Sequence, residues 1–86
     1  MVTIAKRGER DLAAVPVQER KKIIEGLRQL GEESPNVDVK ALAGHAGWYR
    51  LRVGNWRVLY FSDDQGVIIE RIVNRRDLER SVRNLP

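Results

Sequence analysis

Apolar and polar residues alternate most clearly between residues 48 and 61, where the chain reads WYRLRVGNWRVLYF. Side chains of a β-strand point alternately to the two faces of a sheet, and Gly54-Asn55 is a favoured two-residue hairpin turn. The pattern therefore predicts a β-hairpin in which Val53 pairs with Trp56 and Arg52 pairs with Arg57. One face of this hairpin is predicted to join the core, and it carries Tyr49, Leu51, Val53, Trp56, Val58 and Tyr60.

The opposite face of the predicted hairpin is basic and aromatic, because it carries Trp48, Arg50, Arg52, Arg57, Leu59 and Phe61. Arg52 and Arg57 are predicted to lie directly across from each other, and like charges in a cross-strand pair repel. No acidic residue lies between residues 48 and 62 to relieve this repulsion. We therefore expect an external anion as the partner, and phosphate fits best because a guanidinium binds it bidentately.

Periodicity elsewhere predicts helices before the hairpin, and a strand and a helix after it. In chain order, the predicted elements are a strand over residues 2–5, helices over 6–15 and 16–31, a connector over 37–47, the hairpin, a strand over 67–73 and a helical tail over 75–85. The order is β-α-α-β-β-β-α. It predicts an α+β fold in which two N-terminal helices pack on a small, mostly antiparallel sheet, with a short C-terminal helix. We expect residues 1–86 to form one domain.

Two local questions follow from this pattern. The strand over residues 67–73 is apolar at both of its alternating positions, which predicts a central strand covered on both faces. Which face Glu70 and Arg71 take depends on whether the turn before this strand contains a bulge, and that question stays open. In the second helix, apolar residues recur at helical spacing at Val17, Ile23, Ile24, Leu27 and Leu30. The basic run Arg20-Lys21-Lys22 lies beside this stripe and is interpreted as a solvated face, with nucleic-acid contact as the alternative.

Composition adds a basic charge and removes several chemistries. The net charge is +4 and the pI about 10.0, which favours a polyanionic partner. All basic residues after position 47 are arginines. The chain has no cysteine and a single histidine, His45, so no metal and no cofactor is expected. The segment Val2–Ala5 is too short for a signal sequence and the run Leu12–Val17 contains a proline, so we expect a cytoplasmic protein without a membrane span.

Three motifs resemble the RelE/ParE superfamily of toxins from type II toxin–antitoxin modules: LAG at 42–44, YRLRVGNWRVLY at 49–60 and IVNRRDL at 72–78. The resemblance covers essentially the whole chain. RelE-type members are endoribonucleases that cut mRNA, typically in the ribosomal A site, whereas ParE-type members share the fold and poison DNA gyrase. The resemblance implies an mRNA interferase with two expected partners, a cognate antitoxin and ribosome-bound mRNA. A ParE-type gyrase inhibitor and a catalytically inactive relative that only binds a partner remain as alternatives.

The resemblance also implies which basic residues form the site. The two basic positions before the hairpin turn match Arg50 and Arg52, and the arginine on the following strand matches Arg57. The arginine at the end of the last strand matches Arg75, with Arg76 beside it. Fixed cations stabilise the charge that builds on a phosphate under attack. Arg52, Arg57 and Arg75 are therefore expected to be catalytic, and Arg50, Arg52 and Arg76 to bind RNA.

The candidate acid–base and stacking groups are less uniform. Asn74 stands where many relatives have histidine, and Glu79 stands where a tyrosine is common. Arginine stays charged and is a poor proton-transfer group. The general base is therefore sought between Glu79 and Glu70, with Glu79 preferred. Trp48 and Phe61 either stack on RNA bases or pack under the C-terminal tail.

Overall fold

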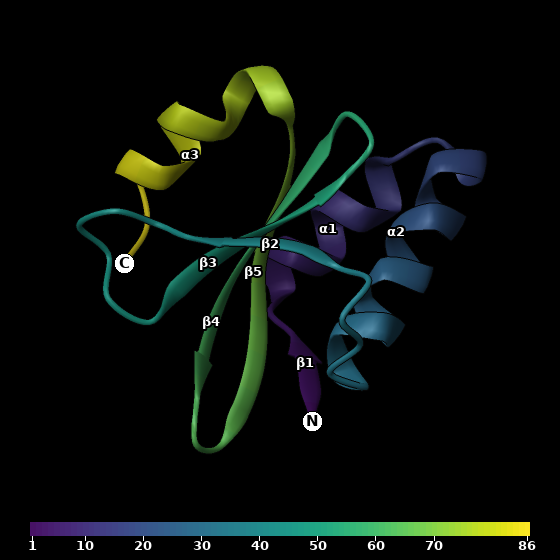
Figure 1. Ribbon diagram of the computed structural model, residues 1–86. Coiled ribbons are helices and arrows are strands. Elements are labelled where there is room, and N and C mark those ends of the chain that lie inside the picture. The colour runs from purple at the N-terminus through teal and green to yellow at the C-terminus, as the bar shows by residue number, and fades with distance from the viewer.

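The computed structural model describes residues 1–86 and is drawn in Figure 1. Its strands are β1 (Val2–Ile4), β2 (Asp38–Ala41), β3 (Trp48–Val53), β4 (Trp56–Asp63) and β5 (Gly66–Asn74). Its helices are α1 (Lys6–Ala14), α2 (Val17–Gly31) and α3 (Leu78–Arg83), with a 3-10 turn over Arg75–Asp77 before α3. The predicted α+β fold is confirmed.

All five strands form one sheet in the order β1-β5-β4-β3-β2. The β1–β5 pair is parallel and the other three pairs are antiparallel. Helices α1 and α2 lie on one side of this sheet and α3 lies on the other (Figure 1). The face on the α3 side, which carries the predicted basic residues, is called the open face below.

The predicted hairpin is confirmed in every pair. Val53 pairs with Trp56, Arg52 with Arg57, and the register continues to Trp48 with Phe61. Gly54 has φ +57°, a left-handed conformation that glycine adopts without a steric penalty. A two-residue turn leaves the strands no freedom to slip, so this turn sets which side chains share each face.

The segment after α2 was expected to be a connector, and that expectation is wrong over residues 38–41. These residues form β2, which pairs antiparallel with β3 at the edge of the sheet. All four residues of β2 are exposed. The polar and apolar residues of this strand do alternate, but over only four residues, which is the shortest run that can signal a strand, so the pattern was not distinguished from a connector. The strand places Asp38 opposite Arg52.

Strand β5 lies between β1 and β4, as its apolar character predicted. Its register against β4 shifts at one point: Leu59 pairs with Arg71, but Tyr60 pairs with Ile69. Glu70 is therefore the extra residue of a β-bulge. The bulge answers the question that the sequence left open, and it brings Arg71 to Asp11 of α1, whose carboxylate lies 2.7 Å from the Arg71 Nε. Helix α1 approaches β5 closely, since a Cβ on Gly8 would meet the Ile69 carbonyl oxygen at 2.8 Å.

The core lies between the sheet and helices α1 and α2. Its buried members come from both helices and from β3, β4 and β5: Val15, Ile23, Leu27, Leu51, Val58, Tyr60, Ile69 and Ile72. Two apolar residues of α2, Val17 and Ile24, were assigned to the same stripe, yet they are 56% and 49% exposed. Helix α2 therefore presents apolar surface away from the core.

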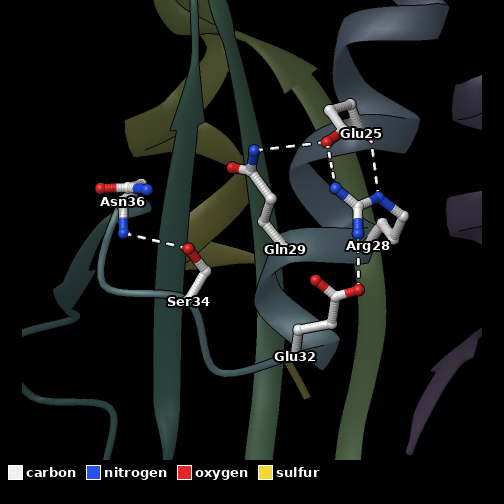
Figure 2. Close-up of polar contacts among 6 residues, drawn as sticks. All are labelled: Glu25, Arg28, Gln29, Glu32, Ser34 and Asn36. Atoms are coloured by element: carbon white, nitrogen blue, oxygen red, sulfur yellow. Dashed lines mark hydrogen bonds and ion pairs between the residues drawn. The ribbon is translucent and has the colours of Figure 1, made fainter.

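Polar contacts hold the two ends of α2. At its start the Arg20 guanidinium donates to the carbonyl oxygens of Ala13 and Val15, so one member of the basic run caps α1 instead of facing only solvent. Near its end, Arg28 binds Glu25 and Glu32 on the exposed surface, as Figure 2 shows. The chain then turns at residues 32–36, where the backbone N–H of Asn36 donates to the Ser34 hydroxyl (Figure 2).

Candidate functional site

Four arginines share the open face near the tip of the hairpin, and we call them the arginine cluster: Arg50, Arg52, Arg57 and Arg75. Arg50 and Arg52 come from β3 and Arg57 comes from β4. Arg75 follows β5, and its backbone N–H donates to the carbonyl oxygen of Asn55 at 2.8 Å, which ties it to the hairpin turn. The structure thus brings together four of the predicted site residues, from β3, β4 and the 3-10 turn after β5.

Arg57 is a partly buried charge of the cluster. Its Nη1 donates to the carbonyl oxygens of Gly54 and Trp56 at 2.9 and 3.0 Å, which fixes the guanidinium over the turn. No carboxylate lies within ion-pair distance of it. Partial burial lowers the pKa of Arg57 from its usual value, and the positive charges of Arg52, Arg50 and Arg75 lower this pKa further. Arg57 is therefore a positioned cation whose charge is left largely uncompensated by the protein.

Asp38 is the acidic neighbour that sequence reasoning missed. Its carboxylate lies 3.2 Å from Arg50 Nη1 and 3.8 Å from Arg52 Nη1. The expectation that only an external anion would relieve the arginine repulsion is therefore corrected, because β2 supplies one carboxylate. The cluster still holds four positive charges against this one negative charge, so it retains a net attraction for anions. The sequence signal for Asp38 is weak, since the residue lies ten positions before the hairpin begins.

The two aromatic residues of the open face contact each other. The rings of Trp48 and Phe61 meet edge to face with centroids 5.4 Å apart, and both side chains are half-buried. Leu59 and Val73, which share this face, are fully or nearly fully buried at 0% and 6% exposure. The open face thus has an apolar floor beside its charged region.

The predicted acid–base candidates lie apart from the cluster. Glu79 is exposed in the first turn of α3 and forms no hydrogen bond or ion pair within the chain. Glu70 is the extra residue of the bulge, where its charge raises the pKa of neighbouring Arg71. Asn74 has a structural contact, because its side-chain oxygen accepts from the Arg76 N–H and caps the 3-10 turn.

Arg76 lies in a different place from Arg75. It lines a cavity of about 360 Å³ at the free edge of β5, between α1 and α3, together with Asp11, Trp56, Arg71 and Arg80. In this cavity Asp11 accepts from the Arg71 guanidinium and from the Ile72 backbone N–H. The hydrogen bond to Asp11 raises the pKa of Arg71 above its usual value. The charge of Arg71 is therefore compensated within the fold, unlike that of Arg57.

The chain belongs to the RelE/ParE superfamily of type II toxins. The profile of a family described as "ParE toxin of type II toxin-antitoxin system, parDE" matches residues 2–79. The chain is 31% identical over 85 residues to Toxin RelE3 of Methanocaldococcus jannaschii, and the match covers 90% of this chain and 92% of that protein. The function at this level, that of a toxin of a type II toxin–antitoxin system, follows from this membership.

Solved structures agree with this assignment. The toxin of the RelB–RelE complex from Methanococcus jannaschii has a TM-score of 0.75 and 28% identity, with 92% of this chain and 96% of that chain covered. The RelBE2 complex from Mycobacterium tuberculosis also has a TM-score of 0.75, with 30% identity over 87% of this chain and 96% of that chain. The isolated E. coli RelE toxin shares the fold at a TM-score of 0.72 and 17% identity, with 99% of this chain and 98% of that chain covered.

Two further findings describe what the fold contains. The longest helix, α2, has 15 residues, and none of the helices combines the length and apolar character that a membrane crossing requires. The structure gathers no group of three or more His, Cys, Asp or Glu side chains in a metal-binding arrangement.

Proposed function

We propose that this toxin is a metal-independent endoribonuclease that cleaves mRNA on the ribosome and so inhibits translation. The arginine cluster carries the proposal: three further cations, Arg50, Arg52 and Arg75, surround Arg57, which has no carboxylate within ion-pair distance. A site that keeps unpaired positive charge at one place is suited to a phosphate that becomes more negative during a reaction. The curated relative is named a RelE toxin, which supports the same reading.

The proposed chemistry is attack of a ribose 2′-hydroxyl on the adjacent phosphate with in-line departure of the 5′-oxygen. Arg52 and Arg57 hold the phosphate between the hairpin strands, and Arg75 approaches from the end of β5. These guanidiniums stabilise the charge on the phosphoryl oxygens. Arg50 binds the RNA chain beside the reacting phosphate. Trp48 and Phe61 offer aromatic surface on which a neighbouring nucleobase can stack. Holding the RNA in line with the leaving oxygen supplies further acceleration.

The test is inducible expression of the toxin followed by primer extension on a reporter mRNA. We expect discrete cuts within translated codons for the wild type and none for Arg57→Ala. Arg28→Ala is the matched control, because Arg28 is an exposed arginine on α2 outside the open face. Cleavage by purified toxin on programmed ribosomes should persist in excess EDTA. Growth arrest without cuts in the mRNA would contradict the proposal.

The second candidate function is inhibition of DNA gyrase without catalysis. The observation that favours it is the family profile, which is that of ParE toxins and covers residues 2–79. Asn74 and Glu79, at positions where RelE relatives often carry histidine and tyrosine, favour it as well. A supercoiling assay with purified gyrase distinguishes the two functions, because an interferase should leave gyrase unaffected.

A cognate antitoxin is the second partner that we propose. Similar chains were solved as RelB–RelE antitoxin–toxin complexes. This chain offers two surfaces that suit such a partner: the exposed Val17 and Ile24 of α2, and the basic open face. An antitoxin helix or extended segment with apolar and acidic residues would cover both kinds of surface. Co-expression with the neighbouring small open reading frame should restore growth and yield a complex that copurifies with the toxin.

A further inference from the structure

Asp38 stands in line with the two central arginines of the cluster. The sheet register pairs Asp38 of β2 with Arg52 of β3, and Arg52 with Arg57 of β4. One row of the open face therefore reads acid, cation, cation from the edge of the sheet inward. Neighbouring strands lie about 4.8 Å apart, so a phosphate held between Arg52 and Arg57 has Asp38 on the side of the adjoining nucleotide.

The contacts of Asp38 orient its carboxylate and leave one oxygen available. Oδ1 accepts a hydrogen bond from Arg50 Nη1 at 3.2 Å, and the same guanidinium nitrogen donates to the Asp38 carbonyl oxygen. Oδ2 lies 3.8 Å from Arg52 Nη1, which is an ion pair but too long for a hydrogen bond. The Asp38 side chain is 53% exposed. A substrate hydroxyl can therefore reach Oδ2.

The other acids near the open face lack this placement. Asp38 is the one carboxylate that lies within 4 Å of any arginine of the cluster. Glu79 makes no contact with an arginine of the cluster, and the charge of Glu70 acts on Arg71 at the bulge. The proposed reaction needs a base within hydrogen-bond reach of the 2′-hydroxyl. Geometry therefore favours Asp38 over both acids that the sequence nominated.

We propose that Asp38 is the general base of RNA cleavage, an inference that rests on the proposed endoribonuclease function. The Asp38 carboxylate removes the proton of the 2′-hydroxyl, and the 2′-oxygen forms a bond to phosphorus as the bond from phosphorus to the 5′-oxygen breaks. The leaving 5′-oxygen takes a proton from water, and the resulting hydroxide takes the proton from Asp38. The products are a 2′,3′-cyclic phosphate and a 5′-hydroxyl, and the enzyme returns to its starting state.

This placement also assigns a direction to the bound RNA. The nucleotide that provides the 2′-hydroxyl lies over β2 and β3, and the nucleotide that leaves with the 5′-oxygen lies over β4 and Arg75. Arg50 acts as a positioning residue for the base, because its guanidinium holds both the Asp38 side chain and its backbone carbonyl.

The experiment compares Asp38→Asn with wild type in single-turnover cleavage of mRNA bound to programmed ribosomes. The amide keeps the shape of the side chain but does not take up the proton, so we expect the cleavage rate to fall by about 100-fold or more. A second readout is the affinity for the same mRNA with a 2′-deoxy nucleotide at the cut site, which we expect to be unchanged or higher. The affinity shows that Asp38→Asn still binds the substrate, and a residue that merely balances charge would leave the rate of cleavage intact.

The pH dependence provides an independent readout. Asp38 faces Arg50 and Arg52 from β3, Arg57 from β4 and Arg75 after β5, and Lys40 lies two residues away on its own strand. A carboxylate can accept the proton of the 2′-hydroxyl only in its ionised form. The acidic limb of the cleavage-rate profile should therefore be present in wild type, reappear in Asp38→Glu, and be absent in Asp38→Asn.

Controls separate the possible failures. Glu25→Gln is the matched variant, because Glu25 is also an exposed carboxylate paired with an arginine, but on α2; it should cleave like wild type. If wild type cleaves the mRNA and the rate of Asp38→Asn lies within threefold of the wild-type rate, the assignment of Asp38 as the base is wrong, whereas the proposed endoribonuclease function still holds. A rate loss in Glu79→Gln with none in Asp38→Asn moves the base to Glu79. Absence of cleavage by wild type removes the proposed function and the base assignment with it. If Asp38→Asn does not fold, Asp38→Ser replaces it.

Discussion

Arg57 and Arg71 lie on neighbouring strands, yet their surroundings are opposite. Arg71 is bound by Asp11 with Nε to Oδ2 at 2.7 Å, and this hydrogen bond raises its pKa. Arg57 has only backbone carbonyl acceptors, and burial together with the charges of Arg52, Arg50 and Arg75 lowers its pKa. The protein thus supplies a carboxylate partner for the guanidinium of Arg71 and none for that of Arg57, which can still bind an anion.

We propose that this difference separates a structural charge, at Arg71, from a functional one, at Arg57. Asp11 satisfies both Arg71 and the Ile72 N–H at the free edge of β5, so it joins α1 to the sheet. A charge bound in this way contributes to stability and has little left for a ligand. The positive charges of the arginine cluster repel one another, and a bound anion would relieve this repulsion. Substitutions at the two arginines should therefore damage the protein in different ways.

The largest effect is expected from the pair of substitutions Arg57→Ala and Arg71→Ala. Loss of one hydrogen-bond donor that is positioned for the transition state typically lowers a reaction rate by about 100-fold to 1,000-fold. We therefore expect Arg57→Ala to lower the rate of mRNA cleavage by about 100-fold or more. Its thermal stability should change little, because relief of repulsion offsets the lost carbonyl contacts. Arg71→Ala should instead lower the melting temperature and retain the cleavage rate of the folded fraction. Calorimetry and cleavage assays on the same samples check both results.

The reverse outcome would remove the contrast. If Arg57→Ala unfolds the protein, or if Arg71→Ala abolishes cleavage while remaining folded, then the distinction between a structural and a functional arginine is wrong. Arg28→Ala, at an exposed ion pair on α2, should do neither and is the control for loss of an arginine as such.

A bound anion should stabilise the protein through the cluster alone. A non-cleavable oligonucleotide with 2′-deoxy nucleotides, supplied at a hundred times its Kd, should raise the free energy of unfolding by about 2.7 kcal/mol. The increase should be nearly lost in Arg57→Ala and retained in Arg71→Ala. For single strands, each removed phosphate contact should reduce the slope of log affinity against log salt by about 0.7. An equal shift in both variants would show that the anion binds elsewhere.

Asp11→Ala should be the next largest change, and it acts on stability. It breaks the ion pair with Arg71 and leaves the Ile72 N–H without its acceptor. Hydrogen bonds to charged groups contribute about 1.5–3 kcal/mol to the free energy of unfolding. The Asp11 side chain is 19% exposed, and because solvent weakens an ion pair, we expect the free energy of unfolding to fall by about 2 kcal/mol. Denaturant unfolding measures it. Asp64→Ala, in the exposed turn between β4 and β5, is the matched control and should leave the midpoint unchanged.

The smallest effect is expected on the helix-covered face, at Tyr60. Desolvation raises the pKa of Tyr60, and the stacked Tyr49 ring, 5.5 Å away, raises it further. Because the folded state holds the phenol proton more tightly than the unfolded state, the associated stability is present below a pH of about 10 and is lost as the pH rises above it. Melting curves between neutral pH and pH 11 should show this decline in wild type and a shallower decline in Tyr60→Phe. Parallel curves would place the titration at another group.

Local signals accounted for the hairpin and for most of the cluster. The alternation over residues 48–61 and the turn at Gly54-Asn55 predicted the opposition of Arg52 and Arg57, which the register confirms. The helix boundaries agree to within two residues at α1 and α2. These features depend on neighbours in the chain, and a two-residue turn allows one register only. The apolar pattern was less reliable at Val17 and Ile24, since periodicity indicates a stripe but not its burial.

The sequence by itself therefore determined the hairpin, the faces of its side chains and the presence of an arginine surface. The tertiary structure alone decided three other things: that residues 38–41 form an edge strand which carries Asp38 to the cluster, that a bulge at Glu70 directs Arg71 to Asp11, and that Arg76 lines a separate cavity. Asp38 and its partner Arg50 lie 12 positions apart in the chain, and Asp11 and its partner Arg71 lie 60 positions apart. Such pairs form because packing brings distant segments together, and neither residue carries a local signal of its partner.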